Sequence, residues 1–367
     1  MRTSIEIGRA LGIPIRLHIT FLLILPPFIL IFMQQPPPFG FAEIDSFAVR
    51  AILATLTTVV LFGCVIAHEL SHSYVAMGYG VKIDSITLFI FGGIASMRTI
   101  PKDPGVEARI AIAGPLMSIF LATIFIAVQI PFNTIPGGIW WKGFGILSFS
   151  LGAINLVLGL FNLLPAFPMD GGRILRAYLV KKEGSYISAT RKAVQVGKIF
   201  AILMAAFGLL YGGWMLILIA FFIYIAASEE ESATIIQSAM EGIKVRDIMT
   251  RELVTVSPYL TVREFIEFML RDRHKGYPVV DPVSGGLLGV VSLTDVKSVP
   301  SEKHDEVTVR DIMSRELITI NPDATAAEAL RLIADHNIGR VLVVEDGVLD
   351  GILSKTDLIR AIEILRG

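Results

Sequence analysis

The sequence predicts a polytopic α-helical membrane protein, with about six transmembrane helices and a small β segment, followed by a soluble α/β pair of repeats. Hydrophobic residues make up 53% of the 367 residues and charged residues only 18%, whereas a soluble globular protein carries roughly a quarter charged residues. Residues 1–228 hold 16 Lys and Arg against 9 Asp and Glu, and the rest of the chain holds 16 against 24. The net charge therefore changes from +7 in an apolar part to −8 in a polar part.

Composition also excludes two classes of protein. Neither part has the basic excess of a nucleic-acid-binding protein, so no nucleic-acid partner is expected. Cys64 is the only cysteine, which excludes a fold held together by internal disulfides. The partner that the apolar part requires is a lipid bilayer.

Long stretches without Asp, Glu, Lys or Arg set the expected membrane spans, because a helix needs about 20 apolar residues to cross about 30 Å of hydrocarbon. The last uncharged stretch, 199–228, would be about 45 Å long as one helix. Gly212-Gly213 lies in its middle and breaks a helix, so two spans are expected there. The expected spans are 17–34, 48–77, 107–130, 145–168, 191–210 and 213–229.

Lys and Arg residues lie mainly on one side of these spans. The segments expected in the cytoplasm, 1–16, 79–106 and 171–195, carry twelve of them, and the segments expected outside carry Lys142 alone. The positive-inside rule therefore predicts a multi-pass protein of the cell membrane, with the N-terminus and the soluble tail in the cytoplasm. Residues 83–90, rich in β-branched and alternating residues, predict a strand that precedes Phe91-Gly92-Gly93.

A metal-binding motif, His68-Glu69-Leu70-Ser71-His72, ends the second span. Residues i and i+4 share a face of a helix, so the two imidazoles can bind one zinc ion. Glu69 beside them can accept a proton from zinc-bound water. Ionisable residues within a span are costly and usually functional. Alternatively, the helix simply emerges into water at this point.

A third ligand has to come from another part of the chain, because a hydrolytic zinc site has three protein ligands and one open position. Asp170 is the only acidic residue between Glu107 and Glu183, and the topology places it at the same depth as the two histidines. Alternatively, Asp170 is simply a residue of a helix C-terminal turn that precedes two glycines. Asn162 could stabilise an oxyanion, or it could satisfy backbone groups freed by the nearby prolines.

These motifs resemble the site-2 protease family of intramembrane zinc metalloproteases, which pairs HExxH with Asn-x-x-Pro-x-x-x-Leu-Asp-Gly; Met169 replaces the Leu here. The resemblance covers about residues 1–228. It implies His68, His72 and Asp170 as ligands of one zinc ion per protomer, Glu69 as the catalytic glutamate and Asn162 as an active-site residue. The implied substrate is a transmembrane or membrane-anchored protein. Gly114-Pro115 also resembles the family, whereas Ser118 stands where Asn is expected.

The tail contains an internal repeat. Residues 247–262 (DIMTRELVTVSPYLTV) match residues 311–326 (DIMSRELITINPDATA), and residues 289–295 match 351–357. Each unit predicts a helix (264–273 and 326–336) and an apolar strand (278–280 and 341–344). Two copies of a small α/β unit usually pack together and bury a shared face.

The repeats resemble a tandem pair of CBS domains, at about 244–299 and 305–367, after a linker at 229–243. The resemblance implies an adenine nucleotide (ATP, ADP or AMP) as regulator and a homodimer formed through the pair. The residues that match the family's nucleotide contacts are Ser292, Thr294, Asp295, Ser354, Thr356 and Asp357. The alternative is that these Thr and Asp residues cap the following helices.

Two main functions are consistent with the sequence, and a third, a non-proteolytic zinc-binding scaffold, is disfavoured because zinc binding alone does not require Glu69. The first is an intramembrane zinc metalloprotease, possessing both the HExxH spacing and an Asp at the right depth. The alternative is a membrane channel or transporter gated by the CBS pair, in which the buried His and Asp residues serve ion passage. Catalysis requires the HExxH spacing and conduction does not, so the protease is the preferred interpretation.

The charge bias generates a testable prediction. A reporter that is active only in the cytoplasm, fused after Gly367, should be active, because twelve basic residues hold the expected inner segments on that side. Activity of a reporter that works only outside would contradict the orientation, and would show that residues 199–228 cross the membrane once.

Overall fold

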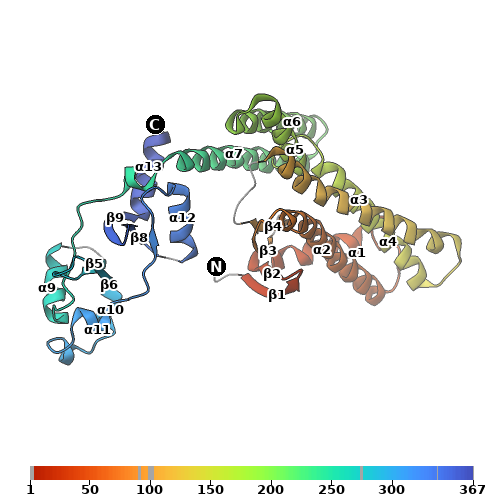
Figure 1. Cartoon of the computed structure of the whole chain (residues 1–367). Helices are drawn as coiled ribbons and strands as arrows, with labels where there is room; N and C mark the ends of the chain where they lie inside the picture. Colours follow the sequence, from red (N-terminus) through yellow and green to blue (C-terminus); the bar gives the residue numbers. More distant parts are fainter. Residues whose placement is uncertain (1–3, 90–91, 98–102, 273–275, 337, 367) are drawn as a thin grey trace. The chain divides into compact units, whose positions relative to one another are not determined.

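The computed structural model describes residues 4–89, 92–97, 103–272, 276–336 and 338–366. They fall into two compact units, Met1–Ser232 and Ala233–Gly367 (Figure 1). The first unit contains the apolar helices and a small sheet, and the second contains the repeats. The polytopic helical class with an α/β pair is therefore confirmed.

The first unit opens with a β-hairpin that hydropathy did not predict. β1 (Ser4–Ala10) pairs antiparallel with β2 (Ile13–His18). The two residues between them, Leu11 and Gly12, have φ angles of 53° and 79°, as a type I′ hairpin turn requires. The sheet is completed by β3 (Ile83–Phe89), parallel to β2, and β4 (Gly92–Met97), antiparallel to β3.

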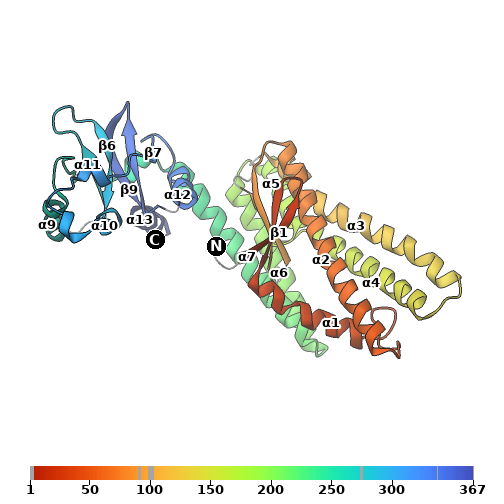
Figure 2. The same cartoon turned by 90° about the horizontal axis from the view of Figure 1, so that it is seen from below.

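The strand expected at 83–90 is confirmed over Ile83–Phe89 as β3, and Ile90 and Phe91 lie outside the described residues. The strand order is β1-β2-β3-β4, so β4 is an edge strand. Both β3 and β4 contact α2, and the sheet lies beside that helix (Figures 1 and 2).

Four of the described helices are long and apolar enough to cross a membrane. Six spans were expected, and these four correspond to the second, third, fourth and fifth. Their bounds are α2 (Phe47–Gly78), α3 (Pro104–Thr134), α4 (Ile139–Asn162) and α6 (Tyr186–Leu210).

The first and last expected spans differ from the prediction. Residues 17–34 are not one helix: His18 ends β2, a 3-10 helix (η1) follows at Ile19–Leu23, and α1 covers Leu25–Gln34. Two prolines begin α1, where a missing N–H carries no cost. α7 runs from Trp214 to Gly242, so residues 229–242 of the expected linker are helical.

The two interruptions expected within the apolar sequence are present. Gly212, at a φ of 70°, lies in the turn between α6 and α7. α4 ends at Asn162, six residues before the expected end of its span, because Pro165 and Pro168 cannot continue a helix. The chain resumes as α5 (Asp170–Glu183) after a non-helical segment, and α5 packs against α3 and α6.

The second unit contains two copies of one arrangement. The first copy comprises α8 (Val245–Ile248), α9 (Val262–Asp272), β5 (Gly276–Val280), β6 (Leu287–Ser292) and α10 (Leu293–Lys297). After η2 (Ser301–Lys303), the second comprises α11 (Val309–Ile312), β7 (Thr319–Ile320), α12 (Ala326–Asp335), β8 (Arg340–Glu345), β9 (Val348–Ser354) and α13 (Lys355–Arg366). The predicted helices and strands of both copies are confirmed.

Each repeat contributes backbone hydrogen bonds to the other. Thr250, which lies between α8 and α9, exchanges two backbone hydrogen bonds with Ile352 of β9. Ser314, which follows α11, exchanges two with Val290 of β6. The offset of these pairs follows the sequence repeat, so the second unit has internal two-fold symmetry. Two separate apolar cores, one around Phe265 and one around Leu353, lie under the two sheets.

Candidate active site

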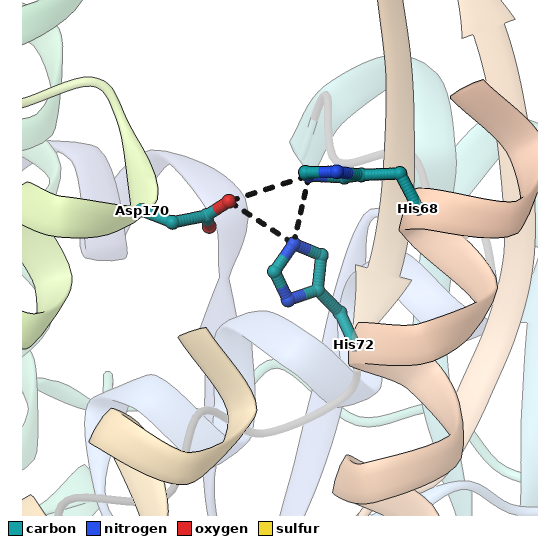
Figure 3. A group of neighbouring side chains, drawn as sticks. All are labelled: His68, His72 and Asp170. Atoms are coloured by element: carbon teal, nitrogen blue, oxygen red, sulfur yellow. Dashed lines mark hydrogen bonds and ion pairs between the residues drawn. The ribbon is translucent and has the colours of Figure 1, made fainter. Parts of the chain in front are cut away.

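The candidate site begins with the two histidines of α2. His68 and His72 are one helical turn apart, and their side chains are buried (Figure 3). Their Nε2 atoms lie 3.2 Å apart. Two ring nitrogens that face each other in an apolar helix are arranged to share a cation rather than to bond to each other.

Asp170 supplies a third donor atom at the same point. Its Oδ2 lies 3.3 Å from Nε2 of His68 and 3.1 Å from Nε2 of His72 (Figure 3). A tetrahedral zinc ion with bonds of about 2.0–2.2 Å separates its N and O ligands by roughly 3.3–3.6 Å. The three donors therefore fit one face of a zinc tetrahedron, and the remaining vertex is left for water or substrate.

Hydrogen bonds on the far side of each imidazole hold both rings. Nδ1 of His72 lies 2.7 Å from the carbonyl oxygen of Ile110. A carbonyl only accepts, so Nδ1 carries the proton and Nε2 presents a lone pair. Nδ1 of His68 lies 2.9 Å from the hydroxyl of buried Ser118. Ser118 thus takes the orienting position that metal-binding histidines usually fill with a polar partner.

Gly114 allows α3 to pass directly over the two rings. A Cβ at this position would lie 2.2 Å from Nε2 of His72 and 2.6 Å from Nε2 of His68. Any side chain there would occupy the space beside the two Nε2 atoms. The Gly-Pro of the sequence therefore has a steric explanation.

Two glycines place Asp170 at the start of α5. A Cβ on Gly171 would lie 2.1 Å from the carbonyl oxygen of Leu164, and one on Gly172 would lie 2.5 Å from the backbone nitrogen of Phe167. The non-helical segment after α4 thus packs onto the first turn of α5. Asp170 lies at a helix N-terminus, where a carboxylate is favoured, and not in a helix C-terminal turn.

Glu69 is half-buried and borders strand β4. A Cβ on Gly93 of β4 would lie 2.6 Å from Cγ of Glu69. The edge strand therefore passes immediately beside this glutamate. Asn162, the last residue of α4, donates from Nδ2 to the carbonyl oxygen of Leu158 at 3.0 Å. Leu158 lies within α4 and its carbonyl is not one that Pro165 or Pro168 frees, so both the backbone role and the oxyanion role of Asn162 stay predictions.

The six residues of the CBS signatures divide into two sets. Ser354, Thr356 and Asp357 line a cavity of about 270 Å³, together with Arg340 and Tyr277. Of the described residues that line it, none comes from the first signature, Ser292, Thr294 and Asp295. In both signatures the Asp accepts from the backbone N–H and the hydroxyl of the Ser, which caps the following helix.

Comparison with known proteins identifies the family. The profile of Peptidase family M50 matches residues 56–138 and 131–206, and that of the CBS domain matches residues 245–302 and 309–364. "Zinc metalloprotease MJ0392" of Methanocaldococcus jannaschii is 42% identical over 365 residues, which cover 100% of this chain and 98% of that protein. The chain belongs to peptidase family M50.

A further relative matches the whole chain, and a solved structure matches part of it. Rip3 of Mycobacterium tuberculosis (strain H37Rv) is 33% identical over 383 residues, covering 100% of this chain and 94% of that protein. The solved structure "Site-2 Protease from Methanocaldococcus jannaschii" is 43% identical and covers 62% of this chain and 95% of that chain, with a TM-score of 0.44.

The M50 protein is an intramembrane zinc metalloprotease, as the sequence motifs predicted, and it acts on membrane proteins within a bilayer. Its four long apolar helices make it a multi-pass membrane protein. The channel or transporter alternative receives no support, because the relatives that match the whole chain are metalloproteases.

The site geometry generates a prediction for Gly114. Gly114→Ala should remove most of the zinc, because the new methyl group would lie within 2.2–2.6 Å of both Nε2 atoms. The measurement is metal content of the purified full-length protein by atomic absorption. Gly63→Ala, in α2 where a Cβ meets nothing within 4 Å, is the matched control and should keep its zinc. Equal zinc in both variants would contradict the close approach of α3.

Proposed function

We propose that His68, His72 and Asp170 bind one catalytic zinc ion per protomer and that Glu69 is the general base of peptide-bond hydrolysis. The observation that carries the proposal is the convergence of three donor atoms to within 3.1–3.3 Å of one another. The bound zinc ion would polarise the scissile carbonyl and make the attacking water more acidic.

The protein residues around the zinc site have separate roles in the reaction. Glu69 takes the proton of the attacking water and passes it to the leaving amine. Ser118 and the carbonyl of Ile110 hold the imidazoles in orientation. Asn162 is proposed to contact the substrate carbonyl or the oxyanion that forms from it. The substrate is a transmembrane or membrane-anchored protein, cut near the cytoplasmic face, where the charge bias places His68 and Asp170.

Glu69→Gln tests the assignment of the base. The amide has the same shape but cannot accept the proton, so cleavage of a single-span substrate should fall by about 10²–10⁴-fold, with zinc retained. Ser71→Ala is the matched control within the motif, because among the described residues the Ser71 hydroxyl bonds only to the carbonyl of Ala67 in its own helix. It should keep both zinc and activity. Near-normal cleavage by Glu69→Gln would place the base elsewhere.

We further propose that an adenine nucleotide, ATP, ADP or AMP, binds the CBS pair and regulates the protease. Ser354, Thr356 and Asp357 meet Arg340 at one cavity, which joins a carboxylate suited to ribose hydroxyls with a guanidinium suited to phosphate. The equivalent Ser292, Thr294 and Asp295 are proposed as a second, weaker site. The pair is also the proposed surface of a homodimer.

Nucleotide binding can be separated from helix capping by comparing two aspartates. Asp357→Ala and Asp295→Ala each remove the same Ser-Asp cap, but only Asp357 lines the cavity. Calorimetry with AMP, ADP and ATP on the full-length protein should show the larger loss of affinity in Asp357→Ala. Equal losses would indicate a capping role, and no binding at millimolar nucleotide would contradict the proposal.

A further inference from the structure

A buried arginine lies in the helix that carries the third proposed zinc ligand. Arg176 of α5 is 1% exposed, although it is charged and belongs to the membrane unit. It lies six residues after Asp170, about 9 Å further along the same helix. Burial of a charge is costly unless the charge is paired, so its partners show what α5 is attached to.

The first partner is Glu107 of α3, which is fully buried. Nε of Arg176 donates to Oε1 of Glu107 at 2.9 Å, and Nη2 donates to the same oxygen. This pair fixes α5 to α3. The guanidinium also lies over the ring of Phe167, at 4.8 Å, in the segment that leads into Asp170. Arg176 therefore anchors the chain on both sides of Asp170.

The same face of α3 also holds the two histidines. Glu107, Ile110, Gly114 and Ser118 follow each other at spacings of three or four residues, so they share one face of the helix. Ile110 and Ser118 bond to the imidazoles, and Gly114 lies against them. The position of Asp170 relative to the histidines is thus set through α3, by the Arg176–Glu107 pair on one side and by these contacts on the other.

The second partner of Arg176 is on α7. Nη1 donates to Oε1 of Glu230 at 2.9 Å, and the Glu230 side chain is 36% exposed. The next residue, Glu231, accepts from Nζ of Lys198 on α6 at 3.1 Å. α7 continues without a break to Gly242, and Met240 near its end is buried in the core of the second repeat. The helix that holds Glu230 is therefore also part of the CBS unit.

We propose that Arg176 is a positioning residue for Asp170. Because Glu230 binds Arg176, the position of Asp170 then depends on where α7 lies. Glu107 is the permanent partner of Arg176, because it is buried and bound by two donors. Glu230 is the detachable partner, because it is partly exposed and bound by one. A shift of α7 that withdraws Glu230 leaves Arg176 paired with Glu107 alone, which loosens α5 and the carboxylate at its first residue. This inference rests on the proposed zinc ligands.

The test uses the full-length, zinc-loaded protein in lipid nanodiscs and measures the rate at which zinc is lost to a chelating dye. Glu230→Gln removes the charge that bonds to Arg176 but leaves no buried charge unpaired, so folding should persist. It should release zinc several-fold faster than the wild type. Glu229→Gln is the matched control: among the described residues no ion-pair partner lies within 4.0 Å of the exposed Glu229. Release at the wild-type rate from Glu230→Gln would overturn the proposal.

A second variant tests whether Glu230 acts on Asp170 through Arg176. Arg176→Lys keeps the charge but cannot bond to two carboxylates from separate edges, and should release zinc about tenfold faster, the lower end of what outer-shell changes cost in metal affinity. Adding Glu230→Gln to Arg176→Lys should cause little further change, because both act through one contact. If the two increases in the rate of zinc release multiply in the double variant, Glu230 does not act through Arg176, and this part of the proposal is overturned.

The double variant His68→Ala/His72→Ala, measured in the same way, distinguishes a failure of the proposed ligand set from a failure of the inference about Arg176 and Glu230. If this double variant keeps its zinc, the proposed ligand set is wrong. If it loses zinc while Glu230→Gln and Arg176→Lys release zinc at the wild-type rate, the ligand set stands and the inference about Arg176 and Glu230 is wrong.

Discussion

The close packing of one face of α3 against the ends of α2 and α5 is the constraint on which the remaining geometry depends. The two histidines lie on α2 and Asp170 lies on α5, and in the part of the chain that the structure describes their three donor atoms form hydrogen bonds or ion pairs only with one another. α3 serves as the common reference, since Ile110 and Ser118 hold the rings and Glu107 holds α5. Gly114 lets the helices approach closely enough for one ion to bind all three donors.

Burying charged side chains in the apolar medium of a membrane unit costs free energy unless they are paired within the protein, so the pairing restricts how the helices can pack. Glu107 pairs with Arg176, whose guanidinium lies between the rings of Phe167 and Tyr186. Each partner also determines where a helix lies, so satisfying the buried charges and assembling the site are one physical problem.

The sequence allowed His68, His72 and Asp170 to be proposed as ligands because each of them carries a local signal. His68 and His72 have the helical spacing of a metal site, and Asp170 is an isolated acidic residue at matching depth. Pro165 and Pro168 predicted irregular backbone before Asp170, although α4 ends six residues before the expected end of its span. These inferences needed only helical periodicity, charge and the cost of irregular backbone in a membrane.

Other features depend on contacts that no local pattern encodes. β1 is exposed at most positions and Leu11-Gly12 is an unusual turn pair, so the hairpin lacks both alternation and a typical turn signal. The run of glutamates after the last apolar stretch indicated a linker, yet it continues α7, and Arg176 and Lys198 bind two of its glutamates. Gly114-Pro115 resembles the family in sequence, but the close approach of Gly114 to the two imidazoles is visible only in the structure.

The most direct test of the central claim is X-ray absorption spectroscopy at the zinc edge of the full-length protein. The account predicts only N and O ligands at about 2.0–2.2 Å, with imidazole scattering from two histidines that falls to half in His72→Ala. Sulfur scattering at about 2.3 Å, which would implicate Cys64 on the same helix, or a spectrum unchanged by His72→Ala and by Asp170→Ala, would contradict it.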